Sequence, residues 1–204
     1  MRPGFVLAAG SFTLFAIIMF CVILGGYSSF TRAQNRIAAS KTFLTDACQK
    51  KLDLLPALFE MTKKSSTQIS IQEIEQAAQK AALILQLVIS RKPPLEIQLT
   101  KDFEQSQIDL TNRLTDLFPE LEESLEPEDL KQFKAIEQQF YTAQDNLFVI
   151  WKSYINEVVY FNSRTVTFPN FLIAKLFGFN KIHYAELSAE AFLPARKTFN
   201  SQAS

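Results

Sequence analysis

The stretch FKAIEQQFYTAQDNLFVIWKSYINEVVYFNSRTVTF, residues 133–168, carries the strongest structural signal in this chain. A large apolar or aromatic residue recurs every seven positions along it. These heptad residues are Phe133, Phe140, Leu147, Tyr154, Phe161 and Phe168. A seven-residue repeat of this length places one apolar seam along a single helix that packs against other helices. We therefore predict a long helix from Pro127, a residue suited to a first helical turn, to Phe168.

Apolar residues at helical spacing predict three earlier helices, over residues 28–65, 70–91 and 95–118. Pro56 lies inside the first of these and removes one backbone amide, which favours a kink there over a break. Pro119 is expected to end the third helix, and an acid-rich turn is expected over residues 120–129. No strand-like alternation competes with this pattern.

The expected helix ends carry capping residues. Ser70 and Glu73 match a capping box at the start of the second helix. After Pro169, Asn170 is suited to cap a short last helix, and Gly178 is suited to end it in a left-handed backbone conformation.

An uncharged stretch lies between Arg2 and Arg32. Within it, Phe5 to Tyr27 is apolar except for two hydroxyl side chains. At about 1.5 Å per residue this segment spans roughly 35 Å, enough for a hydrocarbon core about 30 Å thick. We expect an uncleaved transmembrane anchor in the lipid bilayer. A cleaved signal peptide is the alternative, but its apolar core is typically only about 7 to 15 residues long.

The cationic residues that flank this stretch predict its orientation. Arg2 stands alone on the N-terminal side, whereas Arg32, Arg36 and Lys41 follow the other end. The positive-inside rule then places the N-terminus outside and the bundle in the cytoplasm, with the anchor in a bacterial cytoplasmic (inner) membrane. A bundle in the periplasm is the alternative.

Together these patterns predict an all-α protein. A single N-terminal transmembrane helix precedes an antiparallel up-and-down four-helix bundle with long first and fourth helices and coiled-coil-like packing. The expected domain boundaries are 1–27 for the anchor, 28–193 for the bundle and 194–204 for a disordered tail.

Composition excludes many function classes. Lys plus Arg and Asp plus Glu both number 21, so no net charge directs the chain toward nucleic acid. With 5 glycines, Gly-rich phosphate loops are disfavoured, and a single histidine, His183, excludes multi-histidine metal sites. Two cysteines cannot form a zinc site or a disulfide framework. We expect no catalytic, cofactor-binding or metal site, and no small-molecule substrate.

Two groups of carboxylates are candidate sites. Asp53 and Glu60, seven residues apart, could share one helix face, but solvated surface positions are favoured. The acidic run over residues 120–129 could attract a cation, yet it lacks the Asp/Asn-Gly spacing of a calcium loop. A solvated turn is favoured there.

The remaining reactive and aromatic side chains are assigned structural roles. Cys48 lies on an apolar helix face and is expected to pack as a small hydrophobe, Cys21 lies in the anchor, and His183 is expected on the surface. Aromatic residues flanking the long seam are expected in the core, or otherwise in a partner-binding strip: Phe148, Trp151 and Tyr160.

Charge is distributed unevenly between the helices. The segment 28–65 is basic, and the segment 102–129 is strongly acidic. The basic helix could face anionic lipid headgroups near the anchor, or it could face the acidic segment.

Several short elements, in order, resemble the LemA family of bacterial membrane proteins. The first is Lys50-Lys51-Leu52-Asp53-Leu54-Leu55-Pro56-Ala57-Leu58, and the second is Phe118-Pro119-Glu120-Leu121. The last group is Tyr154, Val158, Phe161-Asn162, Phe168-Pro169, Ala174 and Gly178-Phe179. The resemblance runs from the anchor to about Ala191, and it implies a single N-terminal span and a helical bundle.

The chain departs from the family pattern at three positions. Gln144 stands where the family tends to have Glu, Trp151 where it tends to have Arg, and Ile155 where it tends to have Asn. If those polar residues serve a shared function, this chain performs it differently or lacks it.

The sequence favours a non-enzymatic, membrane-anchored scaffold that binds protein partners in the cell membrane or envelope. The alternative is a lipid-surface or membrane-shaping module that uses basic and Phe-rich segments. Alternating helix directions return the chain to the membrane near Pro169. The apolar segment 171–179 that follows is expected to plug the open end of the bundle or, as the alternative, to touch lipid headgroups beside the anchor.

Overall fold

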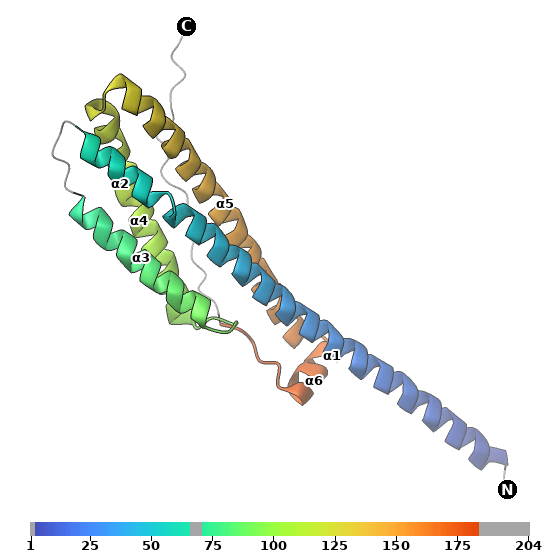
Figure 1. Cartoon of the computed structure of the whole chain (residues 1–204). Coiled ribbons are helices and arrows are strands. Elements are labelled where there is room, and N and C mark those ends of the chain that lie inside the picture. Colours follow the sequence, from blue (N-terminus) through green and yellow to red (C-terminus); the bar gives the residue numbers. More distant parts are fainter. Residues whose placement is uncertain (1–2, 66–70, 184–204) are drawn as a thin grey trace. The chain divides into compact units, whose positions relative to one another are not determined.

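The computed structural model describes residues 3–65 and 71–183, with side chains from Ser11 onward. The expected tail over residues 194–204 lies outside this range. The described residues form helices and no strand, as predicted for an all-α chain (Figure 1). The helices are α1 (Pro3–Leu52), α2 (Leu55–Lys64), α3 (Gln72–Ser90), α4 (Ile97–Ser124), α5 (Pro127–Val166) and α6 (Asn170–Phe177).

The described helices belong to two compact units. Unit 1 contains the chain up to Ile37 together with Asn156–Ile182, so it holds the first part of α1, the end of α5, and α6. Unit 2 contains Ala38–Ile155, and therefore the end of α1, all of α2, α3 and α4, and most of α5.

Unit 2 is an up-and-down bundle. The end of α1 with α2, then α3, α4 and α5 run in alternating directions, as predicted (Figure 1). Lys41 joins α1 to the end of α3, where its ammonium group donates hydrogen bonds to the carbonyls of Ile89, at 3.1 Å, and Arg91. A cation at this end of a helix is favourable, because the last carbonyls have no partner within the helix.

The heptad residues of α5 fill the core. Phe133, Phe140 and Leu147 are completely buried, and Tyr154 and Phe161 are nearly so. In unit 2, Phe118 of α4 meets Phe133 and Phe140 edge-on, with ring centroids 5.8 and 5.3 Å apart. The predicted seam is therefore confirmed up to Phe161. Phe168 is an exception: it is 75% exposed, because α5 already ends at Val166.

Pro56 marks a break and not the predicted kink. α1 ends at Leu52, Asp53 and Leu54 form a turn, and α2 starts at Leu55. Pro56 thereby occupies the first turn of α2, where the backbone amide that it lacks has no intrahelical partner.

Pro119 does not end the third bundle helix, contrary to the prediction. α4 continues through it to Ser124, so most of the expected acidic turn is helical. Pro119 is exposed, while Leu121, two residues further on, is completely buried and Leu125 is nearly so. Burial of these two leucines offsets the lost hydrogen bond, since a buried leucine contributes about 1.5 to 3 kcal/mol.

The predicted caps are replaced by other residues. The N-cap of α3 is Ile71, without a side-chain cap, and Ser70 lies outside the described residues. The N-cap of α6 is Pro169 and not Asn170. Gly178 does end α6 with a φ of 73°, as predicted, and the amide of Phe179 donates to the carbonyl of Ala174 at 2.8 Å.

Candidate functional site

Unit 1 exposes a long apolar helical surface. From Ser11 to Leu24 nearly every described side chain of α1 is exposed, including large ones such as Phe12, Phe15 and Phe20. This helix near the N-terminus is long and apolar enough to cross a membrane, and its most apolar 18-residue window has a mean hydropathy of 2.0. Only 6% of that window is buried, which distinguishes it from the core helix of a soluble protein.

An aromatic cluster lies where this apolar surface ends. Its residues come from α1, α5 and the segment around α6: Tyr27, Phe30, Phe161, Phe177 and Phe179. Tyr27 lies 4.9 Å from Phe177 between ring centroids, and Phe30 stacks on Phe179 at 4.8 Å. The amphipathic ring of tyrosine favours a membrane–water interface.

Cationic side chains follow the cluster in unit 1. Arg36 pairs with Glu157 at 3.1 Å and lies over the ring of Tyr160 at 4.8 Å. Arg164 donates a hydrogen bond to the hydroxyl of Tyr160 at 2.8 Å, and the two arginines lower the pKa of that hydroxyl. The expected core position of Tyr160 is therefore wrong, because its ring is 43% exposed beside these cations.

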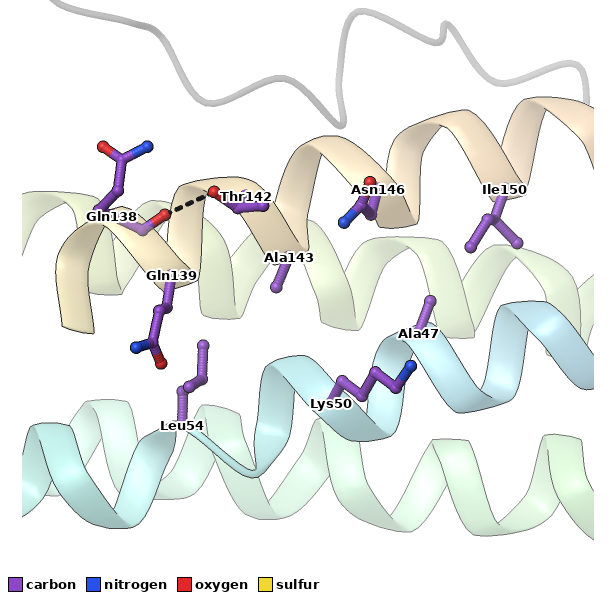
Figure 2. Close-up of a pocket in the computed structure, with 9 residues that line it drawn as sticks. All are labelled: Ala47, Lys50, Leu54, Gln138, Gln139, Thr142, Ala143, Asn146 and Ile150. Carbon is purple, nitrogen blue, oxygen red and sulfur yellow. Dashed lines mark hydrogen bonds between the residues drawn. The ribbon is translucent and has the colours of Figure 1, made fainter. Parts of the chain in front are cut away.

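Unit 2 has a groove of about 410 Å³ between α1, the turn after it, and α5 (Figure 2). It is lined by Ala47, Lys50, Leu54, Gln138, Gln139, Thr142, Ala143, Asn146 and Ile150. Ala47 and Ala143 project into the space between the facing helices, and their short side chains leave it open (Figure 2). With apolar groups at its centre and amide side chains along the α5 wall, the groove offers both apolar contact and hydrogen bonds.

A polar cluster is buried in the same unit. The Lys51 ammonium group, completely shielded from solvent, donates to Thr111 Oγ1 at 2.6 Å and to Gln107 Oε1 at 3.4 Å. Thr111 in turn faces Gln144 Oε1 at 3.2 Å. Glu104, one turn before Gln107, is also completely buried, and neither of its carboxyl oxygens has a hydrogen-bond partner.

Burial shifts the protonation of these groups. It lowers the pKa of Lys51 from 10.5 to about 7, with a smaller opposing effect of Cys48. It raises the pKa of Glu104 to about 7 and that of the Cys48 thiol to about 12. Each group is shifted toward its neutral form, since a charge in the core loses its hydration. A thiol with so high a pKa is a weak nucleophile, consistent with the predicted packing role of Cys48.

The candidate carboxylates Asp53 and Glu60 are not brought together as a pair. Asp53 accepts a hydrogen bond from Gln49 at 2.8 Å, and Glu60 pairs with Lys63 at 2.7 Å; both are exposed. In the acidic run, Asp129 pairs with Lys64 at 2.7 Å and Glu122 pairs with Lys134 at 2.6 Å. Within residues 3–65 and 71–183, no three His, Cys, Asp or Glu side chains are grouped to hold a metal ion.

The other candidates mostly lie where they were expected. Cys21 is exposed on the apolar helix, Cys48 is buried, and His183 is exposed. Phe148 is only partly buried. The Lys64–Asp129 pair joins the basic segment 28–65 to the acidic segment 102–129. This agrees with the expectation that the basic segment faces the acidic one.

Two of the three departures from the family pattern lie in the core of unit 2. The hydroxyl group of Thr111 contacts both Gln144 and Lys51. Because an amide is neutral, buried Gln144 places no charge near the buried amine. Trp151 is buried against Phe103 at 5.7 Å, a position where an arginine would have to bury its charge. Ile155 is partly exposed.

Comparison with known proteins identifies the family. The model of the LemA family matches residues 42–197, most of the chain, and the match begins after the apolar stretch of α1. No curated protein and no solved structure matches the chain. The matched residues include the basic pair before Pro56, the helical bundle and the Gly178-Phe179 element that carried the resemblance. The chain therefore belongs to the LemA family.

Proposed function

We propose that this protein is a membrane-anchored helical scaffold, without catalytic activity of its own, that binds another protein through its bundle. The observation that supports protein binding is the groove lined by Ala47 and Ala143 in unit 2. Membership in the LemA family and the exposed apolar part of α1 support the anchoring.

The groove favours a helix or an extended segment of a partner. Its centre accepts small or apolar side chains between Ala47 and Ala143, while Gln139, Asn146 and Lys50 offer hydrogen bonds along its walls. A partner segment with apolar residues on one side and carboxylates facing Lys50 would match this lining.

Filling the groove should weaken partner binding. Ala143→Trp places a large ring in the space that the alanine leaves open, and we expect about a tenfold or greater loss of affinity, equivalent to about 1.4 kcal/mol. The measurement is the yield of partner cross-linked in native membranes and recovered with the full-length protein. Ala135→Trp is the matched control, because Ala135 is exposed on the same helix and outside the groove.

Two results would contradict this proposal. Equal loss of partner in both tryptophan variants would mean that the groove is not the binding surface. Recovery of lipid alone, with no protein cross-linked to the wild type, would favour the lipid-surface function. The observation that favours this second function is the set of exposed apolar residues around α6.

We also propose that the anchor lies in the cytoplasmic membrane with the bundle in the cytoplasm, as the flanking cations favour. Glu126→Cys places a thiol at an exposed position between α4 and α5. In intact cells this thiol should resist a membrane-impermeant reagent, and it should react after lysis. The wild-type protein, in which Cys48 is buried, is the control. Labelling of the variant in intact cells would reverse the orientation.

A further inference from the structure

Helix α6 has two dissimilar faces. One face is made of Ile173 and Ala174, which are buried, and of Phe177, which is 44% exposed and whose ring contacts Tyr27. The opposite face carries Phe171, Leu172, Lys175 and Leu176 at helical spacing, and all four are exposed. Phe168 lies just before the helix and extends this second face, which we call the outer face of α6.

The buried face of α6 is held against α1 at the end of the apolar stretch. Gly26 allows this approach, since a Cβ atom at that position would lie 2.1 Å from Ile173 Cδ1. A Cβ atom at the neighbouring Gly25 would meet nothing within 4 Å. The contacts of Tyr27 with Phe177 and Phe179 lie at the same level of α1. Within unit 1, α6 therefore lies beside the last turns of the apolar segment.

Exposure of the outer face is costly in water. Leu176 is 67% exposed, Leu172 50% and Phe171 40%, and Phe168 is the most exposed of the group. Removing such side chains from water is favourable, because their apolar surface is poorly solvated. A contiguous exposed group of this kind marks an interaction surface.

The surroundings of the outer face indicate which surface covers it. The outer face of α6 lies beside the end of the apolar part of α1. It also carries a cation, Lys175, whose long side chain can reach lipid headgroups. Arg32, five residues beyond Tyr27, is exposed as well. Apolar and aromatic residues with flanking cations, next to a membrane span, are the make-up of a helix that lies in a membrane interface.

We infer that α6 is an interfacial helix: it docks on Gly26 of α1, and its outer face inserts among the headgroups and upper acyl chains of an anionic bilayer. This inference rests on the proposed membrane anchor and adds a second membrane contact to it. The Ile173 face packs against α1 while the outer face meets lipid. Because α6 directly follows α5 in the chain, these two contacts would hold both α1 and the end of α5 at the bilayer surface.

Spin-label accessibility in the full-length protein tests this inference. The protein carries Cys21→Ala, while the buried Cys48 stays, and it is reconstituted in vesicles of phosphatidylcholine and phosphatidylglycerol. A label at Leu176→Cys should collide more with oxygen, which concentrates in lipid, than with a water-soluble nickel complex. A label at Leu83→Cys, 69% exposed on α3, should show the reverse order.

A third label separates the failure of this inference from the failure of the anchor. Phe15→Cys, in the apolar part of α1, should also favour oxygen. If Phe15 favours oxygen and Leu176 favours nickel, the anchor stands and the inference about α6 is wrong. If both labels favour nickel, the proposed anchor is wrong, and so is the inference about α6, because it depends on the anchor. If the Leu176 label is shielded from both reagents, protein covers the outer face, which also overturns the inference.

A glycine pair tests the docking on α1. Gly26→Leu should displace α6 and move the Leu176 label toward the nickel complex, because the new side chain occupies the place of Ile173. Gly25→Leu should leave the label unchanged, since that position is open. Identical accessibility in both variants would mean that α6 is not held by Gly26.

Discussion

Replacing Phe140 with alanine should lower the free energy of unfolding by about 3 to 5 kcal/mol, the expected cost of removing a fully buried phenylalanine. The ring is completely shielded from solvent. It meets Phe118 edge-on at 5.3 Å, and the Lys51 amine lies 5.6 Å from its centre. Alanine leaves a cavity lined by these groups, and the helices around it can collapse only in part. Denaturant unfolding of the full-length protein in nanodiscs, followed by circular dichroism, measures the loss.

Val149→Ala is the matched control for Phe140→Ala. Val149 lies on the same helix and is 63% exposed, so its truncation should change stability by less than about 0.5 kcal/mol. A loss below about 1 kcal/mol for Phe140→Ala would mean that the heptad seam of α5 is not the core of the bundle.

Replacing Lys51 with methionine should remove a rise in stability between pH 7 and pH 9. In the folded protein burial lowers the pKa of Lys51 to about 7, whereas in the unfolded chain it returns to 10.5. Between these values the unfolded state binds a proton that the folded state does not, so stability increases with pH. At about 1.4 kcal/mol per pKa unit, the rise across this window is on the order of 2 kcal/mol.

The neighbouring Cys48 thiol sets the upper limit, pH 9, of the range in which the rise in stability is measured. Cys48, whose charge couples to that of Lys51, has its pKa raised from 9.0 to about 12, so its ionisation in the unfolded chain would oppose the rise above pH 9. Raising the pKa of Glu104 to about 7 makes stability fall as the pH rises from 4.5 to 7, below the window.

Thermal unfolding at several pH values measures the effect of Lys51→Met. Methionine has a similar length and no charge, and Thr111 keeps its hydrogen bond to the carbonyl of Gln107 at 2.7 Å. Lys50→Met is the control, since Lys50 is exposed and its variant should keep the rise. If the rise persists in Lys51→Met, another group causes it, and Lys51 is not the buried neutral amine.

The sequence marks two positions of the buried polar cluster, because a polar residue interrupts the apolar pattern at each of them. The apolar pattern skips one position between Cys48 and Leu55, and the residue there is Lys51. It skips another between Phe103 and Leu110, filled by Gln107. Both polar residues are completely buried. In each case two apolar residues of one helix face are seven positions apart, and the polar residue between them is in the core. This spacing does not predict which residue the buried polar group contacts.

The sequence by itself determined the all-α class, the apolar stretch before Arg32, the seam from Phe133 to Phe161 and the ending of α6 at Gly178. Each depends on chemistry within one helix: residue spacing, the absence of charge, or the backbone freedom of glycine. The tertiary structure decided that α4 continues through Pro119, because burial of Leu121 in the bundle offsets a local helix breaker. It also decided the partners of Lys51 and the docking of α6 on Gly26. These depend on which side chains distant helices bring together, and the spacing along one helix carries no information about the residues that face it.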